Sequence, residues 1–328
     1  MSNVEIIEVS ADETGVRLDK WFKNRFPTLG HGKLQKLLRT GQVRVDGGRV
    51  KSGTRLEKGQ RVRVPPLGEE LSKPAPRPIP PRLSETDKEE IQNSVLHIDD
   101  EIIVINKPQG LAVQGGSGTT RHVDGMLDAL RFGYSDRPKL VHRLDKDTSG
   151  VLVIARTVET ARRLTQQFRT KDVRKLYWAL VVGVPEPEDG LIDLRLIKAP
   201  GRSGERMIVD EVNGKRSQTR YKVLDTAGKQ ASWLALEPLT GRTHQLRVHL
   251  SDALSTPIVG DGKYGASEAF IEGGIGRNLH LHARRISIPR ENGKEIGISA
   301  PIPDHIKDSF DYLGFIPEED YDLFLELE

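Results

Sequence analysis

Two short stretches near the start of the chain carry apolar residues at helical spacing. The apolar positions are Leu18, Trp21 and Phe22 in the first stretch, and Leu34, Leu37 and Leu38 in the second. Each set falls at i, i+3 and i+4, which predicts a short helix with one apolar stripe. Beyond them, Asp46-Gly47 is a hairpin turn signal, and residues 61–64 alternate between arginine and valine. The pattern predicts a small domain of two helices and short strands.

Strand-like runs dominate the rest of the chain. Two apolar runs within residues 95–106 flank an acidic turn, which predicts a hairpin. Further strands are predicted at 150–155, 177–182, 217–223, 233–237 and 286–288. After the first of these, Ala161, Leu164 and Phe168 share one face and predict a helix, whereas residues 245–250 fit a strand or a short helix. Many strands without strict βαβ alternation predict an α+β fold on a mixed, mainly antiparallel sheet.

A proline-rich stretch separates the two regions. Residues 64–81 hold seven prolines among charges of both signs, a composition that stays extended and builds no core. With 328 residues, the chain is long enough for one large domain and a small one. We therefore expect a small domain at 1–64, a linker at 65–90 and a large domain at 91–328.

Positive charge is concentrated in the small domain. Residues 15–63 contain 14 Lys and Arg against three acids, a local charge of +11, while the whole chain carries only +3. Such a module suits a polyphosphate backbone. The absence of cysteine excludes disulfides, thiol catalysis and thiolate metal sites. No apolar run approaches the roughly 20 residues that span a bilayer, and no signal-peptide pattern begins the chain, so we expect a cytoplasmic protein.

The most informative segment is a polar loop that leads into the apolar run at 150–155. It reads His142-Arg143-Leu144-Asp145-Lys146-Asp147-Thr148-Ser149-Gly150. The Asp145 carboxylate lies between cations, and the strand that follows would hold it in place. In an arbitrary loop, such an aspartate mostly accepts backbone hydrogen bonds of a turn. The nine residues together, however, resemble the signature loop of the ribosomal large-subunit family of pseudouridine synthases.

This resemblance implies roles for individual residues. Asp145 corresponds to the nucleophilic or essential carboxylate, and Arg143 to the arginine that enters the RNA near the flipped nucleotide. Residues 174–179 resemble the motif whose tyrosine, here Tyr177, lies against the target base. Residues 241–249 resemble the motif whose second arginine, here Arg247, pairs with the catalytic aspartate. Without the family, Tyr177 would as readily be a core aromatic, and Arg247 would more readily form a surface ion pair.

The reaction that the family catalyses fits these three residues. Conversion of uridine to pseudouridine breaks an N-glycosidic bond and joins the same sugar and base through carbon. Nothing is oxidised, added or lost, so no cofactor and no metal are expected. The site needs an ionised carboxylate, and Arg247 within about 4 to 6 Å would keep Asp145 charged despite burial. The base must finally lose its C5 proton, and Tyr177 is the candidate that accepts it.

Structured RNA is the expected partner, with no membrane and no obligate protein partner. A base inside folded RNA must be extruded at a cost of about a few kcal/mol, which protein contacts have to offset. Arg143, Lys146 and Arg242 are placed in the sequence to contact phosphates near the site. The basic N-terminal region resembles the S-four RNA-binding domain, a small α/β module named for a small-subunit ribosomal protein. Its candidate RNA contacts are Lys33, Lys36, Arg39 and Arg44.

The whole arrangement looks closest to the C type of the family, which implies 23S ribosomal RNA as substrate. Three alternatives remain. Related synthases act on transfer RNA, and a ribosome-assembly factor would bind RNA without catalysis. A metal-dependent phosphotransferase is suggested by His142, Arg143 and Asp145, but their spacing departs from the kinase loop. Zinc ligands would have to come from scattered histidines, namely His244, His249, His280 and His282.

Overall fold

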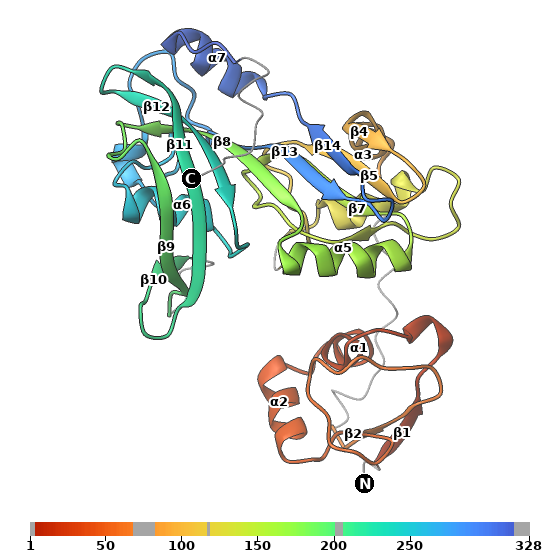
Figure 1. Cartoon of the computed structure of the whole chain (residues 1–328). Helices are drawn as coiled ribbons and strands as arrows, with labels where there is room; N and C mark the ends of the chain where they lie inside the picture. Colours follow the sequence, from red (N-terminus) through yellow and green to blue (C-terminus); the bar gives the residue numbers. More distant parts are fainter. Residues whose placement is uncertain (1–3, 68–82, 117–118, 201–205, 318–328) are drawn as a thin grey trace. The chain divides into compact units, whose positions relative to one another are not determined.

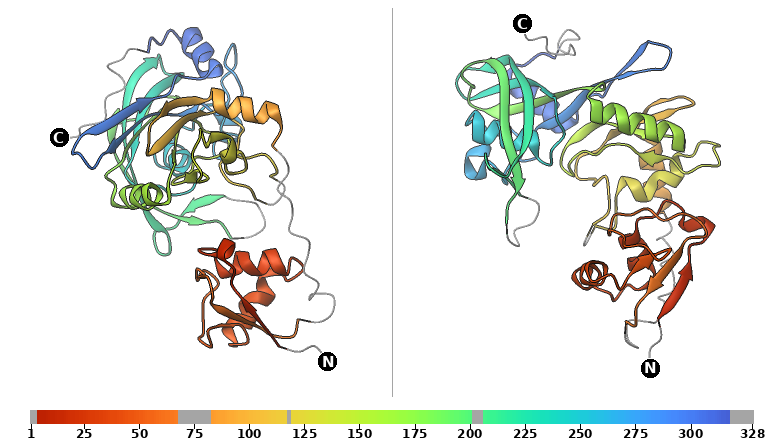
Figure 2. Two further views of the ribbon diagram at one scale, coloured as in Figure 1. Left: turned by 90° about the vertical axis from the view of Figure 1, so that its right-hand side faces the viewer. Right: turned by 60° about the horizontal axis from the view of Figure 1, so that its bottom comes forward.

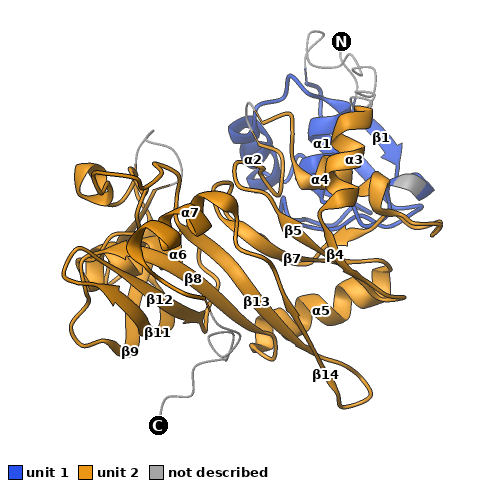
Figure 3. Ribbon diagram, turned by 90° about the horizontal axis from the view of Figure 1, so that it is seen from above, with its two compact units in different colours: residues 1–82 blue, residues 83–328 orange. Residues whose placement is uncertain are grey.

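The computed structural model of the chain describes residues 4–67, 83–116, 119–200 and 206–317. The chain divides into two compact units, Met1–Arg82 and Leu83–Glu328, which Figure 3 distinguishes by colour. The core of unit 1 shares no residue with the clusters that form the core of unit 2. Each unit can therefore be understood as a domain with a core of its own.

Unit 1 packs two helices against a three-stranded antiparallel sheet of order β1-β3-β2. Its elements are β1 (Glu5–Glu8), a 3₁₀ turn (Ala11–Glu13), α1 (Leu18–Arg25), α2 (His31–Arg39), β2 (Arg44–Val45) and β3 (Arg61–Val64). The predicted apolar stripes form the core, in which Trp21, Leu34 and Val62 are buried. Asp46 and Gly47 have φ of 47° and 78° and form the predicted tight turn.

Unit 2 is built on a sheet of 11 strands, with the path β10-β9-β11-β12-β8-β13-β7-β5-β4 and with β14 and β6 paired to β13 and β7 (Figure 1). The strands are β4 (Val95–Ile98), β5 (Ile102–Lys107), β6 (Lys139–Leu140), β7 (Ser149–Ala155), β8 (Arg174–Val182), β9 (Asp189–Lys198), β10 (Met207–Val209), β11 (Lys215–Ala227), β12 (Ala231–Pro238), β13 (Leu281–Pro289) and β14 (Glu295–Ser299). Among the described strand pairs, only β13 and β7 run parallel. The predicted α+β class with a mainly antiparallel sheet is confirmed.

Helices cover both faces of this sheet (Figure 2). They are α3 (Glu85–Asn93), α4 (Val123–Met126), α5 (Val158–Thr170), α6 (Gln245–Val248) and α7 (Asp304–Leu313), with 3₁₀ turns at Leu127–Leu130 and Ala266–Ala269 and a π-helical turn at His249–Ala253. Along β5, Ile103 faces a cluster that contains Ile91 of α3, whereas Ile102 faces a cluster that contains Leu164 of α5. No described helix has the length and apolar character needed to traverse a bilayer.

Two expectations about local structure need correction or completion. Part of the expected linker at 65–90 is helical, because α3 begins at Glu85 and Ser84 caps it by accepting a hydrogen bond from the Asp87 N–H at 3.1 Å. Ile91 then anchors this polar helix in the core of unit 2. Residues 68–82, which hold most of the prolines, lie outside the described residues. The ambiguous segment at 245–250 is helical, as α6 continues into the π-helical turn.

The parallel contact between β7 and β13 lies directly after the polar loop at 142–148. It consists of two residue pairs, His282 with Ser149 and Ala283 with Gly150. A Cβ atom on Gly150 would lie 2.2 Å from the Ala283 carbonyl oxygen, and the φ of Gly150 is +106°. Only glycine allows this close approach. The Ser149 hydroxyl and His282 Nδ1, 2.8 Å apart, add a buried hydrogen bond to the same contact.

Candidate active site

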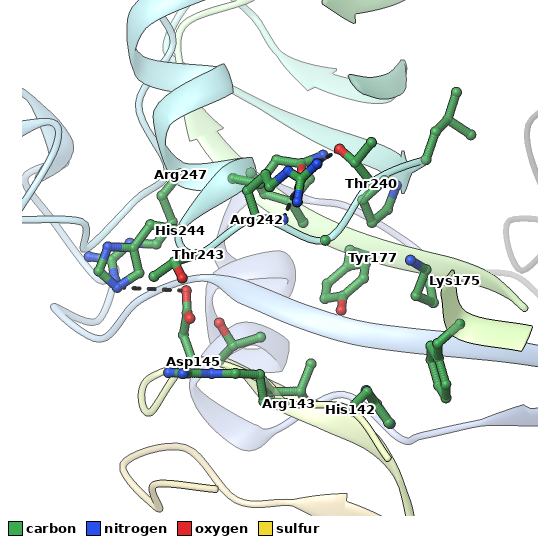
Figure 4. Close-up of a pocket in the computed structure, with 18 of the residues that line it drawn as sticks. His142, Arg143, Asp145, Lys175, Tyr177, Thr240, Arg242, Thr243, His244 and Arg247 are labelled. Atoms are coloured by element: carbon green, nitrogen blue, oxygen red, sulfur yellow. Dashed lines mark hydrogen bonds and ion pairs between the residues drawn. The ribbon is translucent and has the colours of Figure 1, made fainter. Parts of the chain in front are cut away.

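The loop between β6 and β7 brings Asp145 to the wall of a cavity of about 520 Å³. Tyr177 of β8 and Arg247 of α6 line the same cavity, so the structure brings together the three residues that the sequence predicted to carry the chemistry. Figure 4 shows their side chains around the cavity, with Asp145 and Arg143 on the loop and Tyr177 across the cavity from them. The Asp145 side chain is 19% exposed and therefore accessible from the cavity.

A second cavity of about 1250 Å³ adjoins the first. Five residues line both cavities and form the shared wall: Arg143, Leu144, Asp145, His244 and Arg247. Asp145 can therefore interact with groups bound on either side of this wall.

Lys107, the last residue of β5, holds the Asp145 loop from behind. Its side chain is fully buried, and its ammonium donates hydrogen bonds to the carbonyl oxygens of Pro108, Leu111 and Lys146 at 2.8, 2.9 and 3.0 Å. Three acceptors match the three N–H donors of an ammonium. Burial lowers the pKa of Lys107 to about 7, although two nearby carboxylates, one of them Asp145, favour its charge. The backbone immediately after Asp145 is thus tied to β5.

His142 is a structural part of the same loop. Its Nε2 accepts a hydrogen bond from the backbone N–H of Val153 at 2.8 Å, and its ring stacks on Phe168 with centroids 4.4 Å apart. Burial and the nearby Lys175 lower the pKa of His142 to about 3. The ring is therefore neutral at physiological pH, with its proton on Nδ1, and it ties the loop to β7 and α5.

Arg247 is fixed by an ion pair that the sequence did not reveal. Its Nε and Nη2 donate to the two carboxylate oxygens of Asp261, each at 2.7 Å, and 8% and 1% of the two side chains are exposed. Burial disfavours the charge of Arg247, but the hydrogen bonds to Asp261 and the charges of Asp261 and Asp145 raise its pKa. Arg247 is therefore a permanent cation whose charge interacts with that of Asp145.

His244 precedes α6 in a left-handed conformation with φ of 51°. Its Nδ1 lies 2.7 Å from the Tyr264 hydroxyl, and its Nε2 lies 4.0 Å from Oδ2 of Asp145. Burial and the charges of Arg247 and Lys263 lower the pKa of His244 to about 4. The ring is neutral at physiological pH, so its contact with Asp145 is not an ion pair under these conditions.

Gln245 fixes the loop at 239–244 that leads into α6. Its Oε1 accepts hydrogen bonds from the Thr240 hydroxyl at 2.7 Å and the Arg242 backbone N–H at 3.1 Å. Its Nε2 donates to the Gln218 carbonyl at 2.8 Å and to the Thr219 hydroxyl at 2.9 Å. All four bonding positions of the amide are used, which holds this side of the cavity against β11.

Tyr177 and Lys175 occupy alternate positions of β8, and both side chains line the first cavity (Figure 4). Burial raises the pKa of Tyr177, and the charge of Asp145 adds to this effect, so the phenol is neutral at physiological pH. Burial lowers the pKa of Lys175 to about 8; the carboxylate of Glu237 opposes this change and Lys171 reinforces it. The sequence motif drew attention to Tyr177 but not to Lys175.

The residues predicted to contact RNA are found in both units. In unit 2, Arg143 lines both cavities, Lys146 lines the second and Arg242 the first. The Arg242 Nε donates to the Arg216 carbonyl at 3.2 Å, which directs this side chain along β11. None of the three is buried.

In unit 1, the predicted contacts are all exposed. Lys33, Lys36 and Arg39 lie on α2, away from the buried stripe of that helix. The Arg44 guanidinium donates to the carbonyls of Gly41 at 3.1 Å and Gly47 at 3.2 Å, and so lies over the tight turn.

Three of the four histidines that were considered as zinc ligands have hydrogen-bond partners within the protein, whereas both ring nitrogens of His249 are buried without such a partner among the described residues. His280 contacts the Ser309 hydroxyl at 2.8 Å, and His282 contacts the Ser149 hydroxyl at 2.8 Å and the Ala300 carbonyl at 3.3 Å. Burial lowers the pKa of both to about 4. Within the described ranges, no group of three or more His, Asp or Glu side chains could hold a metal ion.

Sequence reasoning missed Lys107, Lys175 and Asp261. Lys107 stands in a turn signal with proline and glycine, and a lysine in such a place is usually exposed. Asp261 lies 14 positions from Arg247, outside the motif that contains the arginine. For Lys175, the available signal was its place two residues before Tyr177, because alternate residues of a strand share a face.

Comparisons with known proteins agree on one family. The chain matches the profile of the family described as RNA pseudouridylate synthase over residues 101–252. Ribosomal large subunit pseudouridine synthase C of Vibrio cholerae is 36% identical to it over 315 residues, which cover 93% of this chain and 96% of that protein. The protein of the same name from Escherichia coli K12 is 36% identical over 310 residues, with coverage of 93% and 95%.

A solved structure supports the same assignment. Human RNA pseudouridylate synthase domain containing 4 superposes with a TM-score of 0.60 at 30% identity, covering 70% of this chain and 97% of that one. The extent and level of these similarities show that the chain belongs to the RNA pseudouridine synthase family, whose members are isomerases.

Proposed function

We propose that this protein converts uridine to pseudouridine at specific sites of large-subunit (23S) ribosomal RNA, with Asp145 as the nucleophile. The observation that carries the proposal is the position of Asp145 and Arg247 on the wall between two cavities, with Tyr177 in the first of them. The relatives named above are ribosomal large-subunit synthases and match the chain over 93% of its length. This favours ribosomal RNA over transfer RNA.

The two cavities suit different parts of a nucleotide. The first has a volume typical of small-ligand sites, which span about 300–1,000 Å³, and its apolar wall includes Phe168, Tyr177, Leu246 and Leu281. The basic side chains that line the second but not the first are Lys146, Lys198, Lys263 and Arg277. A uracil flipped out of the RNA would enter the first cavity, while neighbouring phosphates would lie along the second.

Asp145 would attack C1′ of the flipped nucleotide. The N1–C1′ bond breaks, its electron pair remains on the uracil, and the carboxylate forms an ester with C1′. After the base has turned, C5 attacks C1′, the new C–C bond forms and the carboxylate leaves. Arg247, held by Asp261, would stabilise the carboxylate in its ionised form before attack and after release.

Tyr177 would position the base as a neutral phenol. Its raised pKa argues against a phenolate that removes the C5 proton at physiological pH, which was the role expected from the sequence. The Asp145 carboxylate is ionised again once the C–C bond has formed, and it can accept this proton. The Tyr177 ring then supplies an aromatic surface against which the base can turn.

Unit 1 would add affinity for the RNA backbone. The exposed cations of α2, Lys33, Lys36 and Arg39, together with Arg44, are suited to phosphates. Binding through such contacts weakens steeply as the salt concentration rises, whereas the chemical step in the cavity does not depend on them.

Tritium release from ribosomal RNA transcribed with uridine labelled at C5 tests the proposal, because isomerisation expels the C5 hydrogen. We expect the wild-type protein to release tritium without added metal and in the presence of EDTA. Asp145→Asn should lower the rate by on the order of 10⁴-fold or more, whereas Asp136→Asn, an exposed aspartate outside both cavities, should match the wild type.

Each other outcome has a defined meaning. Activity of Asp145→Asn equal to that of the wild type would eliminate this mechanism. Release from labelled transfer RNA but not from ribosomal RNA would overturn the substrate assignment. Tight binding of RNA without turnover by the wild type would favour an assembly factor, and a requirement for metal would favour a phosphotransferase.

A further inference from the structure

The first cavity contains a cation for which the mechanism above has no use. Lys175 lies on β8 two residues before Tyr177, so both side chains leave the same face of the strand. The lysine is partly buried and lines the cavity next to Tyr177, as Figure 4 shows. Its backbone pairs with Ile286 of β13, and its side chain is among those that line the cavity.

The Lys175 ammonium has no hydrogen bond or ion pair to any of the described residues. Glu237 is the carboxylate whose charge acts on Lys175, but it is already held by the neighbouring Arg174 through two hydrogen bonds of 2.8 and 3.0 Å. Burying a charge without a partner is costly, and buried charges are therefore normally paired. Among the described residues, the Glu237 charge offsets only part of this cost for Lys175, because burial still lowers the pKa of the lysine to about 8.

The reaction itself generates a matching partner. When the N1–C1′ bond breaks and its electron pair remains on the base, the uracil becomes an anion whose charge is shared between N1 and the carbonyl oxygens. We propose that the Lys175 ammonium binds a carbonyl oxygen of the target uracil and stabilises this anion as the glycosidic bond breaks. The ammonium keeps its protons throughout, and the negative charge disappears when C5 attacks C1′. This inference rests on the proposed function and assigns a second catalytic group to the same site.

The charged and neutral groups around Lys175 are compatible with the binding of an anion by its ammonium. The charged side chains that act on it are Lys171, after α5, and Glu237 of β12. His142 and Tyr177, which also line the cavity, are neutral at physiological pH, because burial lowers the pKa of the histidine and raises the pKa of the tyrosine. An anion bound in this part of the cavity would therefore meet the Lys175 ammonium, and the positive charge of the exposed Lys171 would add to its attraction. Such a group is worth more in a water-excluded site than in solvent.

Lys175→Met tests the proposal, since methionine keeps the apolar stem and removes the charge. With enzyme in excess over RNA, we expect the single-turnover rate at saturation to fall by about 10²-fold, while the Kd for RNA stays at the wild-type value. Lys175→Arg, which keeps the charge, should recover most of the rate. Lys222→Met, an exposed lysine of β11 outside both cavities, is the matched control and should leave the rate unchanged.

A change of leaving group separates a catalytic role from a structural one. Fluorine at C5 withdraws electrons and stabilises the uracil anion without help from the protein. The rate in RNA that carries 5-fluorouridine can be followed as the loss of 5-fluorouridine in nucleoside digests. The factor by which Lys175→Met slows the reaction should be severalfold smaller in this RNA than in uridine RNA. An equal deficit for the two substrates would overturn the inference.

The remaining outcomes are also decisive. A weakened Kd with an unchanged rate would mean that Lys175 binds a phosphate, and would overturn the inference. A wild-type protein without activity would refute the proposed function, whereas an active wild type with an equally active Lys175→Met variant would refute only the role of Lys175. If Lys175→Met does not fold, Lys175→Gln takes its place in the same assays.

Discussion

The two sides of the Asp145 loop are built on different principles. Behind the loop, polar groups are paired within the protein: Lys107 bonds to three carbonyl oxygens, and Ser149 bonds to His282. In front of the loop, in the first cavity, Lys175 has no such partner. Both lysines have a pKa that burial lowers, so burial alone does not tell a structural lysine from one that receives a ligand. The two lysines differ in the hydrogen-bond acceptors around the ammonium, which are three for Lys107 and none among the described residues for Lys175.

The largest loss of stability is expected for Lys107→Met, behind the loop. The change leaves three carbonyl oxygens without their donor and removes a buried side chain that fits its site, so we expect the free energy of unfolding to fall by about 3–5 kcal/mol. Urea denaturation measures this loss. Lys175→Met, in front of the loop, should by contrast change stability by less than about 1 kcal/mol. Equal stability losses for the two variants would contradict the comparison.

An intermediate effect is expected on acidification, from two histidines that support the loop. Burial lowers the pKa of His142 to about 3 and that of His282 to about 4, from 6.5. The unfolded chain therefore binds protons that the folded chain does not, so the contribution of these two histidines to stability is complete above pH 6.5 and declines as the pH falls toward 4. Each histidine contributes a slope of at most about 1.4 kcal/mol per pH unit.

Urea denaturation between pH 7 and pH 4.5 would measure this slope. His282→Gln, which removes one titrating ring, should flatten the curve, whereas Lys175→Met should leave its shape unchanged. An unfolding free energy that stays constant over this range would show that these histidines do not remain neutral in the folded protein.

The smallest effect is expected for Ser149→Ala. It removes one buried hydrogen bond to His282, and we expect a loss of about 1 kcal/mol of stability. The single-turnover rate at saturating RNA should stay at the wild-type level, because the Lys107 contacts still hold the loop. A large loss of rate with intact stability would show that the groups behind the loop also tune the chemistry of Asp145.

Local patterns were sufficient to predict many of the elements. The stripes of Trp21 and Leu34, the turn at Asp46 and Gly47, and the strand at 150–155 followed from periodicity and turn residues alone. Strand β9 was not predicted. Only Ile192 and Leu196 of its ten residues are buried, and charged residues interrupt the apolar ones, so the sequence shows no clear apolar run. Helix α3 was not predicted either, since eight of its nine residues are polar or charged and only Ile91 is apolar.

The candidate site could be predicted wherever a motif is continuous in the sequence. Asp145, Tyr177 and Arg247 were each found in a contiguous motif, and the structure places them around one cavity. The pairing of Arg247 with Asp261 and the contact of Lys107 with the Lys146 carbonyl, 39 positions away, depend on the path of the chain in space. Periodicity carries no information on such contacts.

The parallel contact between β7 and β13 also affects when the Asp145 loop can fold during synthesis of the chain. Ser149 and His282 are 133 positions apart, and strands β8 to β12 lie between them in the sequence. Contacts of such long range form late, and chains are synthesised from the N-terminus. The Asp145 loop therefore lacks one of its supports until β13 has left the ribosome, so a nascent chain is expected to gain full activity only after this strand has emerged.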